Sequence, residues 1–373
     1  MQNNVAALNQ DATRRIYTTL AGHSDTAWAA DAEHYLGRQL NQAAARADGL
    51  PPHYELLGDW LGREAEGALA AYRRYQCERD DGAPRRHFAN VAQARQFLGA
   101  AAPARLTAGA SLYGVIGRWN DMDFQPMIGS YLELLGDGVP ANNQYLRYQA
   151  LLESNGCPLV QDLPEACYRG AAVELALAQH CDAYLPELIG YNIARQQPCT
   201  ALLVARYELN EMGIDADAFA EPGQAAGSGP SALFSLRGIM ARVADPVTFY
   251  RGVDEGFKLH ALVAQLPLPA ATPGPQAVMP PRDPLDAPPP RAASYAPAET
   301  RLHDRPVIRH HFPADEHAWE AIGSELRLLE ARLAASDSKE EAMSTLSRLM
   351  SPAAQHQPTG LMAARIYSQL FHL

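Results

Sequence analysis

The chain has 373 residues, of which 47% are hydrophobic, so it can bury a substantial core. Its formal net charge of −11 repels polyphosphate backbones and no basic patch offsets it, so we expect no nucleic-acid partner. No apolar run is long enough to cross a membrane, and the first residues lack the apolar core of a signal peptide, so we expect a cytoplasmic protein with no membrane partner. The five cysteines are odd in number and form no Cys-x-x-Cys pair, which predicts reduced thiols, most of them buried.

Helical periodicity runs through most of residues 1–264. Apolar residues recur at spacings of three and four over 26–47 and 54–75, which predicts two amphipathic helices. Further helices are expected, in chain order, over 122–135, 142–154, 163–197, 201–212, 232–243 and 246–263. The segment 163–197 is longer and more apolar, so we place it in the middle of a bundle, with a break or kink at Pro186. No alternating run of β-branched residues predicts a strand, and the expected fold class is all-α.

The composition changes near residue 265. Eleven prolines lie between Pro267 and Pro297, which favours an extended linker over a helix. Helical periodicity then resumes in a C-terminal segment that either docks back on the bundle or meets another chain, over 314–335, 339–350 and 360–371. The predicted organisation is a helical bundle, a Pro-rich linker and a C-terminal helical segment, over 1–264, 265–300 and 301–373.

Three stretches carry a family resemblance. They are SYLELLGDGVPANNQYLRYQALLESNGC at 130–157, LALAQHCDAYLPELIGYNIARQQ at 175–197, and ALLVARYELNEMGIDADAF at 201–219, followed by FYRGVDEGFKL at 249–259. In order, spacing and loop sequence they resemble the iron-containing redox enzyme family of the heme-oxygenase-like diiron oxidase (HDO) superfamily. The resemblance is strongest over 116–264, and it implies a heme-oxygenase-like helical bundle.

The positions that hold the metals in this family are substituted here. The resemblance implies metal-ligating Glu, His and Glu at the first three positions, and His and Asp at two positions after residue 219. This chain has Leu134, Gln144, Gln196, Pro222 and Ala226. Iron that activates dioxygen needs carboxylates to neutralise its charge and imidazoles to fix its geometry, so we expect no metal and no cofactor.

Two structural expectations follow, one from the resemblance and one from local composition. Leu134, Gln144 and Gln196 should converge in the bundle interior, within about 10 Å, by analogy with bimetallic sites. The segment from Pro222 to Pro230 should be non-helical at least in part, because its prolines and glycines oppose a helix.

Five polar residues could also line the cavity at these positions. Glu133 is expected to face solvent or a neighbouring Arg, and Glu187 to stabilise the first turn of a helix after Pro186. Tyr191 and Asn192 are expected to pack or hydrogen-bond at the cavity wall. His180 is expected to be a core histidine bonded to a backbone carbonyl or an acid. The His-rich segment 303–317 has no recognisable metal spacing and is expected to be solvated.

Our first functional hypothesis is a catalytically degenerate, metal-less homologue that acts as a binding or partner-docking module, for example beside an active homologue in a biosynthetic pathway. One rival is an active non-heme iron oxidase or oxygenase with atypical ligands, for which iron would be the cofactor. Another is a cofactor-independent enzyme that uses the same cavity. The family's diiron members commonly resemble dimers, which implies a homo-oligomer or a heteromer with a homologous oxidase.

Overall fold

The computed structural model describes residues 13–22, 29–157, 163–219, 230–264, 268–269 and 338–371, with single positions between 324 and 333. All regular elements within these ranges are helices, so the predicted all-α class is confirmed for the described part of the chain. The longer helices are α2 (Ala29–Ala44), α3 (Leu57–Asp80), α4 (Val91–Leu106), α6 (Gln125–Leu134), α7 (Gln144–Ser154), α8 (Glu165–Gln179), α9 (Leu185–Arg195), α10 (Thr200–Glu211), α11 (Ser231–Met240), α12 (Pro246–Val263), α14 (Lys339–Leu349) and α15 (Pro358–Phe371).

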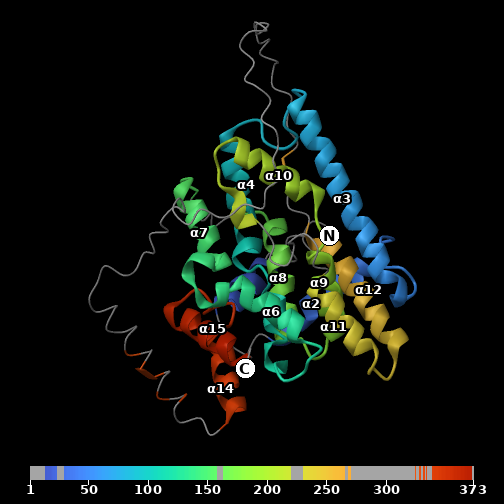
Figure 1. The fold of residues 1–373 in the computed structure, drawn as a ribbon, viewed down its shortest axis with the longest axis vertical. Coiled ribbons are helices and arrows are strands. Elements are labelled where there is room, and N and C mark those ends of the chain that lie inside the picture. The colour runs from blue at the N-terminus through green and yellow to red at the C-terminus, as the bar shows by residue number, and fades with distance from the viewer. Residues whose placement is uncertain are drawn as a thin grey trace, which may run out of the picture.

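These helices form one bundle in which α8 and α9 lie near the middle (Figure 1). Helix α3 runs along one side next to α12, and α14 and α15 lie at the opposite end of the view from α10. Short helical turns connect the longer elements, among them α5 (Ala110–Tyr113), η3 (Ile116–Arg118) and η4 (Gly136–Gly138). Among the described helices, none is both long and apolar enough to cross a membrane.

The long apolar segment is broken as predicted, but earlier than expected. Helix α8 ends at Gln179, and α9 begins at Leu185 after a turn. Pro186 lies in the first turn of α9, where its missing N–H leaves no hydrogen bond unmade. The break therefore precedes the proline, because proline is tolerated at the start of a helix.

Helices α9 and α12 pack against each other through glycines. An added Cβ atom on Gly256 would overlap the carbonyl oxygen of Glu187 and lie 2.6 Å from its Cα atom. One on Gly190 would overlap the carbonyl oxygen of Val253 and lie 2.7 Å from its carbonyl carbon. The two backbones are thus closer than a side chain on either glycine would allow.

A buried carboxylate fixes the loop between α3 and α4. Glu208, on α10, is fully buried and accepts hydrogen bonds from the backbone N–H groups of Arg86, His87 and Phe88 at 2.5, 3.0 and 3.0 Å. It also accepts the hydroxyl of Tyr75, on α3. Hydrogen bonds to a charged acceptor are stronger than neutral ones, so this carboxylate joins three segments of the chain.

The described C-terminal helices dock on the bundle. Met343, Leu346, Met350 and Tyr367 are fully buried and share one apolar core with the bundle helices. Tyr131, on α6, donates its hydroxyl to the carbonyl of Met350 at 2.6 Å. Docking back is therefore the arrangement observed for residues 338–371, whereas the Pro-rich segment 270–300 lies outside the described residues.

The five cysteines are free, as predicted. Cys157 and Cys167 are buried and Cys181 is half-buried, but Cys77 and Cys199 are exposed. Only two of the five are fully buried, so the expectation that most of them are buried was wrong.

Candidate functional site

Gln196 fastens the start of α11 to the end of α9. It follows the last residue of α9, is buried, and its Oε1 atom accepts the backbone N–H of Ala232 at 3.2 Å. Its Nε2 atom donates to the hydroxyl of Ser231 at 2.7 Å, and Ser130 on α6 donates to the same hydroxyl at 2.8 Å. The amide of Gln196 therefore satisfies an N–H group in the first turn of α11 that has no intrahelical partner.

Leu134 is an apolar filler next to this network. It lies one helical turn after Ser130 on α6, is 3% exposed, and packs directly on Gly109, where an added Cβ atom would overlap the Cδ1 atom of Leu134. Gln144 is also buried and begins α7, directly after Asn143, whose Nδ2 atom donates to the carbonyl of Leu135 at 3.3 Å. All three predicted positions are thus interior, while their convergence within about 10 Å stays a prediction.

These side chains do not fit a diiron centre. Leu134 offers no donor atom, and both ends of the Gln196 amide are used by Ser231 and Ala232. Within the described ranges, no group of three or more His, Cys, Asp or Glu side chains could hold a metal ion. Pro222, Ala226 and the segment 303–317 lie outside the described residues.

The segment expected to be non-helical is described only at its end. Pro230 has φ −54° and ψ 129°, which is not helical, and it precedes the first residue of α11.

Asn192 connects α9 with α5. Its side chain is fully buried, and its Nδ2 atom donates to the hydroxyl of Ser111 at 3.1 Å and to the carbonyl of Leu188 at 2.9 Å. Its Oδ1 atom accepts from the Nε atom of the buried Arg195 at 3.3 Å. Asn192 therefore forms hydrogen bonds in the interior, as expected.

The other predicted polar residues have separate surroundings. Tyr191 is buried and meets the ring of His260 edge-on, with ring centroids 5.1 Å apart. His180 follows the last residue of α8, and its Nε2 atom lies 2.8 Å from the carbonyl oxygen of Ala29, as expected of a backbone partner. The residue is half-buried, so its expected place in the core was wrong. Glu133 is exposed on α6.

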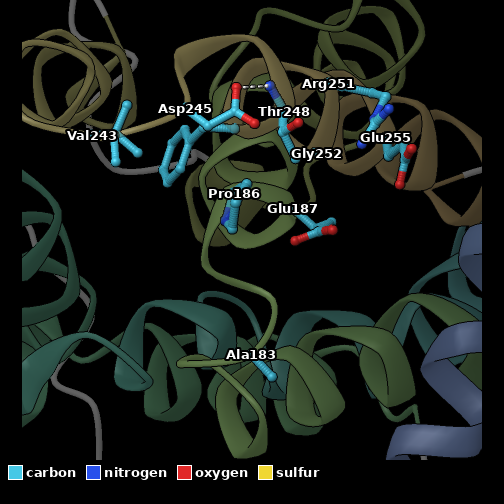
Figure 2. Close-up of a pocket in the computed structure, with 11 residues that line it drawn as sticks. Ala183, Pro186, Glu187, Val243, Asp245, Thr248, Arg251, Gly252 and Glu255 are labelled. Carbon is cyan, nitrogen blue, oxygen red and sulfur yellow. Dashed lines mark hydrogen bonds between the residues drawn. The ribbon is translucent and has the colours of Figure 1, made fainter.

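A pocket of about 330 Å³ opens where the start of α9 meets the start of α12. Its walls include Pro186 and Glu187 from α9, Val243 from the connection after α11, and Phe249 and Glu255 from α12. Figure 2 places Glu187 between α12 and the turn that carries Ala183. Gly252 also lines this pocket, so the close packing of α9 on α12 shapes it.

Glu187 is the distinctive group of this pocket. Its Oε2 atom is buried and has no hydrogen-bond partner. Burial raises the pKa of Glu187 above its ordinary value, the residue's own backbone N–H lowers this pKa, and the nearby carboxylate of Glu255 raises it. Glu187 lies in the first turn of α9, as predicted. Its proximity to Glu255 could not be predicted, because it depends on how two helices pack.

Comparison with protein-family models, with curated proteins and with solved structures finds no match to this chain.

Proposed function

We propose that this chain is a catalytically degenerate, metal-free relative of the heme-oxygenase-like diiron oxidases that acts as a binding or partner-docking module. The observation that carries the proposal is the use of Gln196 as a helix cap. At the position where the resemblance implies a metal-binding carboxylate, both ends of an amide are engaged by the start of α11.

The chemistry of the substitutions supports the same proposal. Leu134 and Gln144 are buried and cannot supply the carboxylate and imidazole that the family resemblance implies at these positions. Iron that activates dioxygen requires anionic and imidazole ligands with an open coordination position. A bundle that keeps its helices but fills these positions with capping and packing side chains is suited to binding rather than to oxidation.

The decisive experiment is metal analysis of protein purified anaerobically from iron-replete cells, combined with dioxygen uptake. We expect substoichiometric, weakly held iron and no iron-dependent oxygen consumption. Stoichiometric, tightly bound iron with a diiron absorption spectrum would refute the proposal and favour an active oxidase with atypical ligands.

A variant tests the capping role directly. Gln196→Ala should lower the free energy of unfolding by about 1 kcal/mol, the usual effect of losing a helix cap, and leave the iron content unchanged. Gln42→Ala is the matched control, because Gln42 is exposed on α2 and its loss should change stability little. Loss of bound iron in Gln196→Ala alone would show that Gln196 is a metal ligand.

The docking part of the proposal predicts an assembly. Light scattering of the full chain should give a mass of at least two chains of 40.5 kDa, or should show a stable complex with a homologous oxidase. A chain that stays monomeric both alone and with such an oxidase would contradict partner docking.

A further inference from the structure

The pocket between α9 and α12 has the size and wall chemistry of a small-molecule site. Its volume of about 330 Å³ lies at the lower end of the range for ligand pockets. Pro186, Val243 and Phe249 give it apolar surface, and Phe249 adds an aromatic ring. It is lined by none of the residues that cap or fill the interior at Leu134 and Gln196, so it is a separate feature of the bundle.

The charged groups of the pocket favour a cation. Glu187, Asp245 and Glu255 are acidic, and Arg251 is basic. Asp245 is already engaged, because its carboxylate accepts the backbone N–H of Thr248 at 3.0 Å and caps α12 (Figure 2). Arg251 is exposed, and none of the described ion pairs joins it to the two glutamates. The pocket therefore offers two carboxylates that have no cationic partner among the described residues.

Glu187 provides the main reason to expect a ligand. A buried carboxylate oxygen without a hydrogen bond is costly, and a second carboxylate nearby increases that cost. An ammonium group would compensate both carboxylates, while an anion would be repelled by them. Apolar walls next to the carboxylates would cover a short hydrocarbon or aromatic body and would exclude a fully hydrated metal ion.

We propose that this pocket binds a small primary ammonium ion with an apolar body, held by Glu187 and Glu255 against Pro186 and Phe249. The ammonium group donates hydrogen bonds to the glutamates, and the apolar body packs on the ring of Phe249. The proposal does not depend on the loss of the metal ligands, so the iron measurements leave it unaffected.

The test is a calorimetric titration of the full chain with benzylammonium, and with benzyl alcohol and benzoate as neutral and anionic probes of the same shape. We expect benzylammonium to bind with a dissociation constant of about 1 mM, the order that a ligand of this size reaches. Benzyl alcohol and benzoate should bind at least about tenfold more weakly, because they lack a charged donor. Equal binding of benzyl alcohol, or no detectable binding of benzylammonium, would overturn the proposal.

Substitutions of the two pocket glutamates test whether the ligand binds in this pocket. Glu187→Gln should weaken benzylammonium binding at least about tenfold, since a hydrogen bond to a charged group is lost while the shape is kept. Glu66→Gln, on the exposed face of α3, is the matched control and should leave the affinity unchanged. If Glu187→Gln does not fold, as judged by circular dichroism, Glu255→Gln takes its place with the same expectation. Unchanged affinity in a folded variant of either pocket glutamate would refute the assignment.

Discussion

The sharpest consequence of the α9–α12 packing is the predicted effect of Gly256→Ala. The new methyl group would overlap the carbonyl oxygen of Glu187 and lie 2.5 Å from its carbonyl carbon and 2.6 Å from its Cα atom. All three are backbone atoms inside a helix, so no side chain can rotate to make room. The two helices must separate, and the buried contacts of Val253 and Leu259 with the core loosen with them.

The expected change in the free energy of unfolding is the sum of two opposing contributions. Overpacking a close-packed interior costs about 1–3 kcal/mol, and the upper end applies here because the obstacle is backbone. Alanine is favoured over glycine in a helix by about 1 kcal/mol, which offsets part of that cost. We therefore expect Gly256→Ala to lower the free energy of unfolding by about 2 kcal/mol.

Urea denaturation followed by far-UV circular dichroism measures this difference. The matched control is Gly67→Ala in α3, where nothing lies within 4 Å of an added Cβ atom. That variant should be more stable than wild type by about 0.5–1 kcal/mol, because only the helix propensity changes. If Gly256→Ala matches or exceeds the stability of Gly67→Ala, the close approach of α9 and α12 is refuted.

Three further predictions concern other parts of the bundle. Glu208→Ala should lower the free energy of unfolding by about 3–5 kcal/mol in urea denaturation, because the buried N–H of Phe88 and the half-buried N–H of His87 lose a charged acceptor. Glu66→Ala should have little effect, because Glu66 is exposed. Burial raises the pKa of Glu187 in the folded state, so its ionisation costs stability as the pH rises. Glu187→Gln should therefore melt higher than wild type at about pH 7 and equally at about pH 4. The opposite order would refute the desolvation of this carboxylate. Tyr367→Phe removes the hydroxyl that donates to the carbonyl of Ile116 at 2.7 Å. The loss of this hydrogen bond should lower the free energy of unfolding by about 1 kcal/mol, and with it the melting temperature. An unchanged melting temperature would contradict this contact between α15 and the bundle.

The helices predicted most accurately are those whose first residues carry a capping side chain or a proline. Helix α12 has the predicted bounds Pro246–Val263, because Asp245 caps it and a proline opens it. Helix α14 begins at Lys339, as predicted, after the capping side chain of Ser338. Periodicity and caps are local properties, so they can be read without knowing what a helix packs against.

Helix α4 was not predicted. Its residues Val91–Leu106 are rich in alanine, and Pro103 interrupts the pattern near the end. The helix is stabilised by packing in a second core with Phe88 and Tyr148, and Tyr148 donates its hydroxyl to the carbonyl of Leu98 at 2.8 Å. A helix that depends on such distant partners leaves a weak local signal.

In the candidate sites, too, local features could be predicted and contacts between distant segments could not. Leu134 and Gln196 were predicted to lie in the interior, and the structure buries both. The partners of Gln196 could not be predicted, because Ser231 lies 35 residues away and no local pattern links the two. The proximity of Glu187 to Glu255 could not be predicted either. It depends on glycines that let two helices approach, and no local pattern encodes that distance.

The docking of the C-terminal helices also has a consequence for synthesis on the ribosome. Tyr131 bonds to Met350, and the apolar core around it includes Met343 and Tyr367, so the bundle helices that emerge first cannot complete their core until roughly a hundred more residues have been made. At about 5–20 residues per second, that delay lasts on the order of 5–20 seconds. During this interval the nascent bundle presents an incomplete apolar surface to the cell, so the growing chain is a natural client for chaperones that shield such surfaces.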